Sequence, residues 1–213
     1  MMAETDLRGK IMQNENKLNY LFFKMSSANK TTDFQLNSCD ILKLSIEHDK
    51  KDIIKKFIYK TGNLNYWIEG NYEKTLLHLA AEHNSWGIAE LLISNGADIN
   101  PRNYKGITPL HLAVIKNNKE LVSILLLYKA DINLVDDKGR TPLHWASILC
   151  IEDMLILLIK EKALINAKDF KGRTALHFAF ERRCEKIKEY LLKNGADDKI
   201  KDFNGKKAKD LIR

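Results

Sequence analysis

The sequence predicts an all-α repeat solenoid, in which similar pairs of helices stack side by side. Two observations predict it. The stretch at 136–147 reappears 33 positions upstream at 103–114 and 33 positions downstream at 169–180, with a partial copy at 73–81. The four histidines within these copies keep the same spacing, at His78, His111, His144 and His177. A fixed period of this length indicates stacked supersecondary units, each burying its apolar face against the next.

Composition sets broad limits on the class of protein. The 213 residues are 45% hydrophobic, as in ordinary water-soluble chains, and no apolar run is long enough to span a bilayer. The N-terminal residues include Glu4 and Asp6 and contain no apolar signal region. Three cysteines without paired spacing favour free thiols and a reducing, cytoplasmic location. The net charge of +7 favours acidic partners, but interspersed acidic residues disfavour a nucleic-acid surface.

Residues 1–38 lie outside the repeat and form an N-terminal extension. Apolar residues spaced three and four apart in residues 1–26 predict a helix, which we expect to cap the first repeat. A disordered tail and a dimerising helix are the alternatives. The polar residues 26–38 predict a linker, with Ser38 as a candidate N-cap for the next helix.

The repeat domain spans 39–213 and divides into units that follow the 33-residue period. A degenerate N-terminal cap comes first, because Ser45 stands where the histidine would be. The C-terminal cap carries Lys209 and Asp210 at positions that are leucine and histidine in the full units, which marks a face on which nothing stacks. The predicted units are the N-terminal cap at 39–70, repeats at 71–103, 104–136, 137–169 and 170–202, and the C-terminal cap at 203–213.

Each full unit encodes a turn, a short helix, a second turn and a second helix. In the unit at 137–169, Gly139 suits a left-handed turn, Thr141 is a good N-cap, and Pro142 suits the first helical position. A second helix carries the apolar pair Leu157 and Leu158. Each unit therefore supplies one antiparallel helix pair to the stack.

The motif Gly-x-Thr-Pro-Leu-His-x-Ala and the closing Gly-Ala-Asp-Ile-Asn at 96–100 resemble the ankyrin-repeat family, over about 39–213. The resemblance implies paired antiparallel helices, short β-hairpin fingers at right angles to them, and partner binding by fingertips and concave inner helices. It also implies the absence of catalysis. The chain departs from the family pattern where glycine is usual, which suggests local backbone strain; these positions are Asn84, Asn117, Cys150, Arg183, Lys129 and Lys162.

The regular histidines do not predict a metal site. Equivalent positions in neighbouring units are separated by roughly 8–10 Å, whereas zinc needs its nitrogens about 2.0–2.1 Å away. We interpret the imidazoles as partners of turn backbone groups between repeats. A disulfide between Cys150 and Cys184 is not expected in a reducing compartment. The sequence shows no phosphate-binding loop, and we expect no enzyme activity, cofactor or metal.

Residues that vary while the frame repeats are the candidates for partner binding. They form a basic stripe and an apolar or aromatic stripe, and exposed aromatics and arginines often dominate interface energy. The predicted function is a protein-interaction module that grips a protein partner, with an acidic patch, on its concave face. A regulatory or targeting subunit and a host-directed effector are the alternatives. The candidate residues are Tyr104, Lys105, Ile107, Ile115, Lys116, Lys138, Arg140, Ile148, Leu149, Phe170, Lys171, Arg173 and Arg182.

Overall fold

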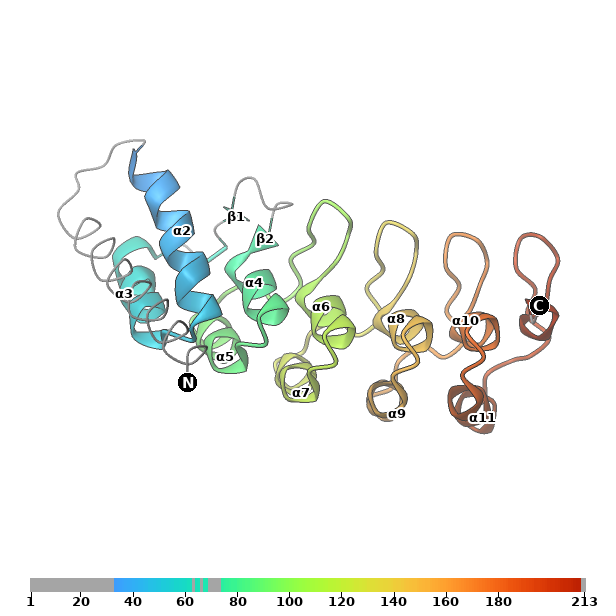
Figure 1. Ribbon diagram of the computed structural model, residues 1–213. Coiled ribbons are helices and arrows are strands. Elements are labelled where there is room, and N and C mark those ends of the chain that lie inside the picture. The colour runs from blue at the N-terminus through green and yellow to red at the C-terminus, as the bar shows by residue number, and fades with distance from the viewer. Residues whose placement is uncertain (1–32, 63, 66, 69–73, 212–213) are drawn as a thin grey trace, which may run out of the picture.

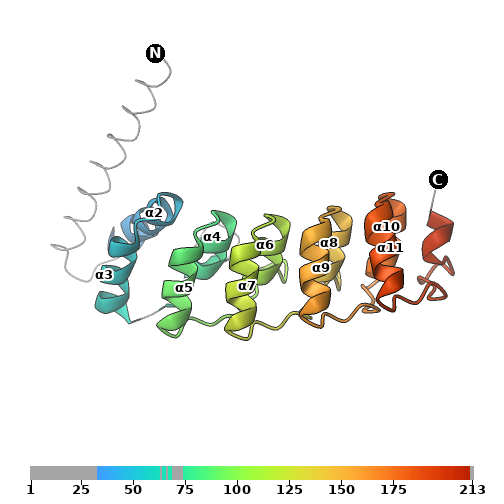
Figure 2. The ribbon, with the colours of Figure 1, turned by 90° about the horizontal axis from the view of Figure 1, so that it is seen from below.

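The computed structural model describes residues 33–62, 64–65, 67–68 and 74–211. The described chain forms a single row of helix pairs, with a loop projecting from each pair (Figure 1). The inner helices lie next to the projecting loops and the outer helices lie farther from them. The predicted helical solenoid is therefore confirmed, and Figure 2 shows the same row of pairs from below.

The helix bounds follow the sequence period. The inner helices are α2 (Asp33–Glu47), α4 (Leu76–Glu82), α6 (Pro109–Ile115), α8 (Pro142–Ile148) and α10 (Ala175–Glu181). The outer helices are α3 (Lys51–Thr61), α5 (Trp86–Ser94), α7 (Lys119–Leu127), α9 (Glu152–Lys160) and α11 (Glu185–Lys193). A 3₁₀ helix, η1 (Ala208–Leu211), follows α11 and packs on α10.

The core runs along the whole stack between the inner and outer helices. Inner helices pack on the next inner helices, and the outer helices α3, α5 and α7 also pack in sequence. Apolar side chains that recur at each period fill the space, such as Leu110, Leu143 and Leu176 from the inner helices, each about 1% exposed. Each unit therefore buries its apolar faces mainly against its neighbours, as in other solenoids.

The loops that project from the stack are the predicted fingers. Strands β1 (Trp67–Ile68) and β2 (Lys74–Thr75) pair antiparallel, with Trp67 opposite Thr75. Later fingers are narrower hairpin turns, in which a backbone N–H at the finger base donates to a carbonyl four residues on; Asp136 donates to Arg140 over 2.9 Å.

Two features of the N-terminal region bear on the sequence predictions. Helix α2 begins at Asp33, so 33–38 are helical, and the prediction of a linker that ends at an N-cap Ser38 is wrong. The start of a helix within a polar stretch is hard to predict, because polar residues are compatible with both helix and linker. The predicted capping helix within 1–26 lies outside the described residues.

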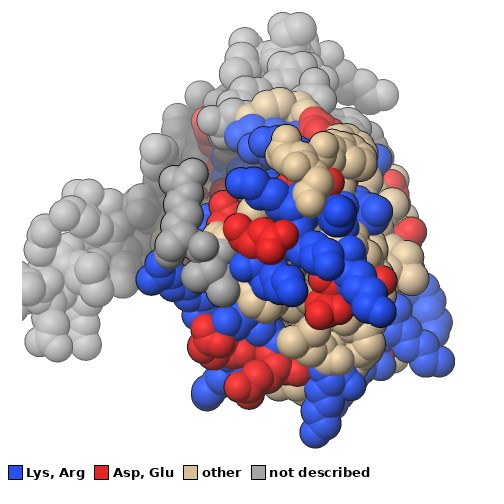
Figure 3. Space-filling model, turned by 90° about the vertical axis from the view of Figure 1, so that its right-hand side faces the viewer, with Lys and Arg blue, Asp and Glu red and all other residues tan. Residues whose placement is uncertain are grey.

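The C-terminal end of the stack is strongly charged. Lysine and arginine side chains, interspersed with acidic ones, cover much of this end in Figure 3. Asp210 takes the place of the histidine and its carboxylate accepts the Lys207 N–H over 2.9 Å, a bond that the histidines make elsewhere with Nδ1. The Asp210 carboxylate therefore supplies at η1 the acceptor that the histidine rings supply at the inner helices.

Candidate functional site

A side-chain oxygen at the base of each later finger holds the finger turn closed. Asp136 Oδ1 accepts the N–H groups of Lys138 and Arg140 over 2.8 and 2.9 Å. Asn103 does the same for the finger before it, and Asp169 and Asp202 for the two fingers after it. These bonds replace the ladder of a longer hairpin, because they satisfy backbone donors inside the turn.

Neighbouring fingertips are joined by backbone hydrogen bonds. The Asp137 N–H donates to the Lys105 carbonyl over 3.0 Å, and the Phe170 N–H donates to the Lys138 carbonyl over 3.0 Å. Gly139 makes this approach feasible, because its φ is +74° and a Cβ there would lie 2.6 Å from the Phe170 nitrogen. The fingers thus form one continuous wall with little freedom to move independently.

The histidines link each inner helix to the next finger. His111 Nδ1 accepts the Thr108 N–H over 3.3 Å, so its Nε2–H is placed to donate to the Arg140 carbonyl, 3.0 Å away. His78, His144 and His177 make the same contacts with Ile107, Arg173 and Lys206. The interpretation of the histidines as partners of backbone groups between repeats is confirmed.

Burial keeps these imidazoles neutral. It lowers the pKa of His78 and of His111 from the ordinary 6.5 to about 4, although a carbonyl contact opposes the shift. Burial lowers the pKa of His144 and of His177 as well. At neutral pH each ring therefore has one donor and one acceptor, as the two backbone contacts require.

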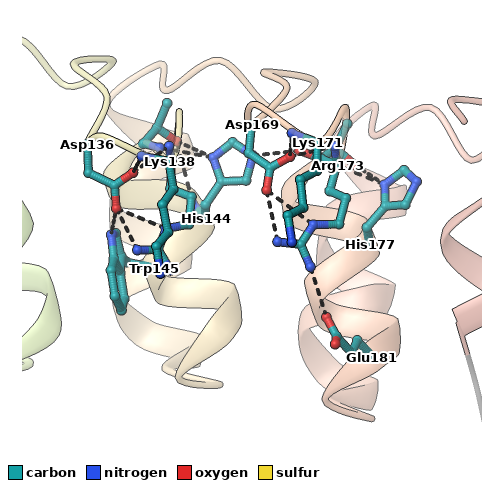
Figure 4. A network of polar contacts seen from close by, with 12 residues as sticks. Asp136, Lys138, His144, Trp145, Asp169, Lys171, Arg173, His177 and Glu181 are labelled. Atoms are coloured by element: carbon teal, nitrogen blue, oxygen red, sulfur yellow. Dashed lines mark hydrogen bonds and ion pairs between the residues drawn. The ribbon is translucent and has the colours of Figure 1, made fainter. Parts of the chain in front are cut away.

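A clasp of Asp136, Arg140 and Trp145 connects one finger to helix α8. Figure 4 labels Asp136 and Trp145 of this clasp. Asp136 Oδ2 accepts from the Arg140 guanidinium over 2.8 Å and from the Trp145 indole N–H over 3.2 Å. The guanidinium carbon lies 4.0 Å from the centre of the indole ring. Burial alone would raise the pKa of Asp136, but hydrogen bonds from the Arg140 backbone and side chain outweigh it and lower that pKa.

The next finger repeats the clasp with different aromatic and acidic groups. Arg173 bonds to Asp169 over 3.0 Å, lies over the ring of Phe178 at 4.2 Å, and reaches Glu181 at 3.5 Å. The side chains of Arg140 and Arg173 are only 15% and 23% exposed. Both arginines were predicted to contact a partner, but their charge is already matched within the chain.

A hollow of about 540 Å³ lies between the fingers at 103–107 and 136–140 and the inner helices α6 and α8. Tyr104, Lys105, Asp137 and Lys138 border it from the fingers, and Leu112, Ile115 and Trp145 line it from helices α6 and α8. Some of the predicted partner-binding residues meet here, namely Tyr104, Lys105, Ile107, Ile115, Lys138 and Arg140. Ile107 is only 8% exposed, so its side chain belongs to the floor of the hollow.

The other predicted residues continue along the stack beyond this hollow. Phe170 and Leu149 are exposed, at 65% and 41%, and Ile148 is half-buried. Lys171 stands on the next fingertip, and Lys116 and Arg182 follow directly after helices α6 and α10; all three are exposed. The predicted residues therefore lie on the fingers and on or directly after the inner helices, and we call this surface the groove face.

Sequence reasoning missed Leu112 and Trp145, which line the hollow. Both occupy the variable position of Leu-His-x-Ala, which changes from leucine to tryptophan while its neighbours repeat. This variation is the signal that could have identified them. Asn103 and Asp136 also line the hollow and were not among the predicted residues.

The charges of the groove face do not balance. Among the described residues, no carboxylate lies within ion-pair distance of four exposed cations: Lys116, Lys138, Lys171 and Arg182. The acidic groups nearby do have partners, since Asp137 lies 3.8 Å from Arg102, and Glu82 lies 2.6 Å from Lys74. The groove face therefore presents cations without matching anions.

The expectation of free thiols is wrong for two of the three cysteines. Cys150 and Cys184 form a disulfide, with Cα atoms 5.8 Å apart. Their separation of 34 residues is one repeat plus one, which brings the turn after α8 beside the start of α11. The expectation failed because it rested on an assumed reducing compartment.

The described residues contain neither a metal-type cluster nor a membrane-spanning helix. No three histidine, cysteine, aspartate or glutamate residues in that part of the chain are grouped as metal ligands would be. No helix in that part is long and apolar enough to cross a membrane.

The stacked helix pairs, the finger wall and the histidine links together define a solenoid scaffold of the helix-pair type. Family models described as ankyrin repeats match residues 110–202 (three copies) and 77–126 (many copies). The chain is also similar to the crystal structure of the ankyrin repeat domain of Bcl-3, a member of the IkappaB protein family. That match has 30% sequence identity and a TM-score of 0.74, and covers 81% of this chain and 77% of that one. The chain belongs to the ankyrin-repeat family.

No curated protein sequence matches the chain significantly. Ankyrin repeats are in general protein–protein interaction modules and non-catalytic scaffolds. Family membership therefore shows which scaffold this chain has.

Proposed function

We propose that this chain binds a protein partner through the groove face, and that the bound surface of the partner is acidic. The observation that supports this most directly is the set of exposed cations without matching carboxylates: Lys116, Lys138, Lys171 and Arg182. They border apolar groups, such as Ile115, that are only half-buried. Cations around apolar surface favour a partner with acidic and apolar groups, because the apolar contact removes hydrocarbon from water and the opposite charges attract and steer the partner.

The proposal is for binding without catalysis. The buried histidines, which are the usual acid–base groups at neutral pH, are neutral and engaged in backbone contacts. The carboxylates of Asp136 and Asp169 are similarly engaged by arginines. A regulatory or targeting role and an effector role are both compatible with this binding. A cytoplasmic site of action stays a prediction, and the Cys150–Cys184 disulfide does not support it.

The test is affinity capture from an extract of the source cells, followed by mass spectrometry and binding measurements on the captured protein. A Lys138→Glu/Lys171→Glu variant reverses two charges on the groove face. We expect it to lose at least about tenfold in affinity, mainly through slower association, and to show a smaller salt dependence. Lys160→Glu, on outer helix α9, is the matched control and should bind like the wild type.

Two outcomes would contradict the proposal. If Lys160→Glu abolishes binding while the groove variant binds normally, the partner uses the outer helices. If mixed-sequence DNA or RNA binds with an affinity that falls steeply with salt, and no protein does, the basic groups serve nucleic acid instead.

A further inference from the structure

We propose that the hollow between the fingers at 103–107 and 136–140 receives one aromatic side chain from an acidic segment of the partner. This inference rests on the proposed function and specifies which chemistry the groove face recognises. It depends on three properties of the hollow: an apolar floor, a fixed shape and a cationic border.

The floor of the hollow is apolar although it is open to solvent. Ile107, Leu112 and Ile115 contribute aliphatic groups, and Trp145 contributes an indole. The volume of about 540 Å³ falls in the range of small-ligand sites, roughly 300–1,000 Å³. The hollow is thus large enough for an aromatic side chain together with part of the backbone that carries it.

The clasp fixes the shape of the hollow before any partner arrives. The Trp145 N–H is already bonded to Asp136 and one face of its ring is covered by Arg140. The indole therefore has no polar requirement left to satisfy and few rotamers available. A preorganised apolar wall favours binding, because little side-chain entropy is lost when the partner docks.

Backbone pairing with the fingertips is not available to the partner at this place. The Asp137 N–H and the Lys105 carbonyl bond to each other, and the Lys138 carbonyl accepts the Phe170 N–H. Addition of a strand to a finger edge would require those groups to be unpaired. Recognition must then come from side chains, with an apolar anchor in the hollow and charges at its border.

The border selects an acidic segment. Lys138 lines the hollow, is exposed and has no ion-pair partner among the described residues. Lys116 does not line the hollow, but it is exposed and follows the lining residue Ile115 in the chain. The carboxylates at the border, Asp136 and Asp137, are instead matched by Arg140 and Arg102. Carboxylates on both sides of the anchor would match these two lysines.

The test uses NMR titration of the full isotope-labelled chain with the blocked peptide Glu-Glu-Trp-Glu-Glu. We expect the Trp145 indole N–H signal and the Leu112 and Ile115 methyl signals to shift in a saturable way. A peptide with alanine in place of tryptophan should bind at least about tenfold more weakly, as expected for loss of an anchor. A peptide with glutamines in place of glutamates should bind several-fold more weakly at low salt, and that difference should vanish at high salt.

Protein variants locate the site. Ile115→Glu places a carboxylate in the hollow and should weaken binding of the tryptophan peptide at least about tenfold. Ile156→Glu is the matched control, because Ile156 is also half-buried but lies on outer helix α9, outside the hollow and away from the groove face; its effect should be under about twofold. Amide spectra and thermal melts of both variants establish that each remains folded.

Each contrary result has a distinct meaning. If no peptide shifts the hollow signals, or the alanine peptide binds equally well, the anchor inference fails, while the capture experiment still decides the proposed function. If the glutamine peptide is equivalent at low salt, the acidic specificity fails. If the hollow signals of the free protein shift on dilution, a second copy of the chain occupies the hollow and the inference is overturned.

Discussion

The finger–helix units at 103–115 and 136–148 have the same backbone and different chemistry. In the later unit, Asp136 closes its turn and also binds Arg140 and Trp145. In the earlier unit, Asn103 closes the same turn, while isoleucine and leucine stand at the positions of the arginine and tryptophan. The neutral amide of Asn103 needs no cationic partner. Ile107 and Leu112 can therefore occupy the equivalent positions in the earlier unit, where they form part of the apolar floor of the hollow.

The largest expected loss of stability comes from removing Asp136, which holds together the charged unit at 136–148. Asp136→Ala removes the partner of Arg140 and of two backbone N–H groups, and should lower the free energy of unfolding by about 3–5 kcal/mol. Asn103→Ala loses only the backbone contacts and should cost about 1–3 kcal/mol. Urea unfolding followed by circular dichroism measures both values.

Substitutions that convert the charged unit at 136–140 into the neutral kind at 103–107 test whether the two sets of contacts are interchangeable. Arg140→Ile alone should be strongly destabilising, since it leaves the buried Asp136 carboxylate without its cation. Adding Asp136→Asn should recover much of the loss, because the pair then matches the neutral unit at 103–107. If the double variant is as unstable as the sum of the single ones, the two chemistries are not interchangeable.

Only the later unit is followed by a disulfide-bonded cysteine, because the position of Cys150 is occupied by Asn117 after the earlier unit. Its loop of 34 residues predicts a stabilisation of about 3–4 kcal/mol from the restricted unfolded chain. Cys150→Ser should lose this amount when measured without reductant. Reductant should destabilise the wild type and leave the variant unchanged; a wild-type melt that ignores reductant would contradict the assignment.

The histidine links are common to both units and should respond to pH alike. Since the pKa of His111 is about 4 in the folded chain and 6.5 ordinarily, the unfolded chain takes up the proton first. This contribution to stability is complete above pH 6.5 and is lost as pH falls from 6.5 toward 4. At pH 5 the loss is about 2 kcal/mol, from 1.36 kcal/mol per pKa unit.

Unfolding curves at pH 7 and pH 5 test this sign and size. His111→Gln should reduce the difference between the two pH values by about 2 kcal/mol, and His144→Gln should change it in the same direction. Parallel pH dependence in the variants and the wild type would show that these imidazoles do not resist protonation.

The smallest expected change in stability concerns the position two residues after an outer helix. Lys129 and Lys162 are left-handed, with φ of 68° and 65°, as the sequence predicted from Gly96 and Gly195 at the equivalent positions. Lys129→Gly and Lys162→Gly should each stabilise the protein by about 1 kcal/mol. Alanine at either position is the control and should give no gain, because it keeps the Cβ that causes the strain.

Features that repeat were predictable from the sequence, and features that belong to one unit were not. The period located the helices, the threonine caps and the histidine links, since each copy supported the others. The clasp required knowing that Asp136 and Trp145 meet across a corner between finger and helix, which a nine-residue separation does not reveal. The candidate site was predicted in part, because residues of the fingers and of the inner-helix ends were identified while Leu112 and Trp145 were not.

The asparagines that end each unit have a mechanical consequence. The side chains of Asn100, Asn133 and Asn166 each accept the backbone N–H of the residue 31 positions on, at 2.9–3.0 Å. Three successive joints of the stack thus carry the same hydrogen bond between one unit and the next. Under tension applied to its two ends, the chain should extend in equal steps of about 100 Å, as the 33 residues of one unit straighten at about 3.3–3.6 Å each. The units joined by the Cys150–Cys184 disulfide would be the exception. The bond prevents the residues between the two cysteines from extending, so that step should be shorter unless reductant is present.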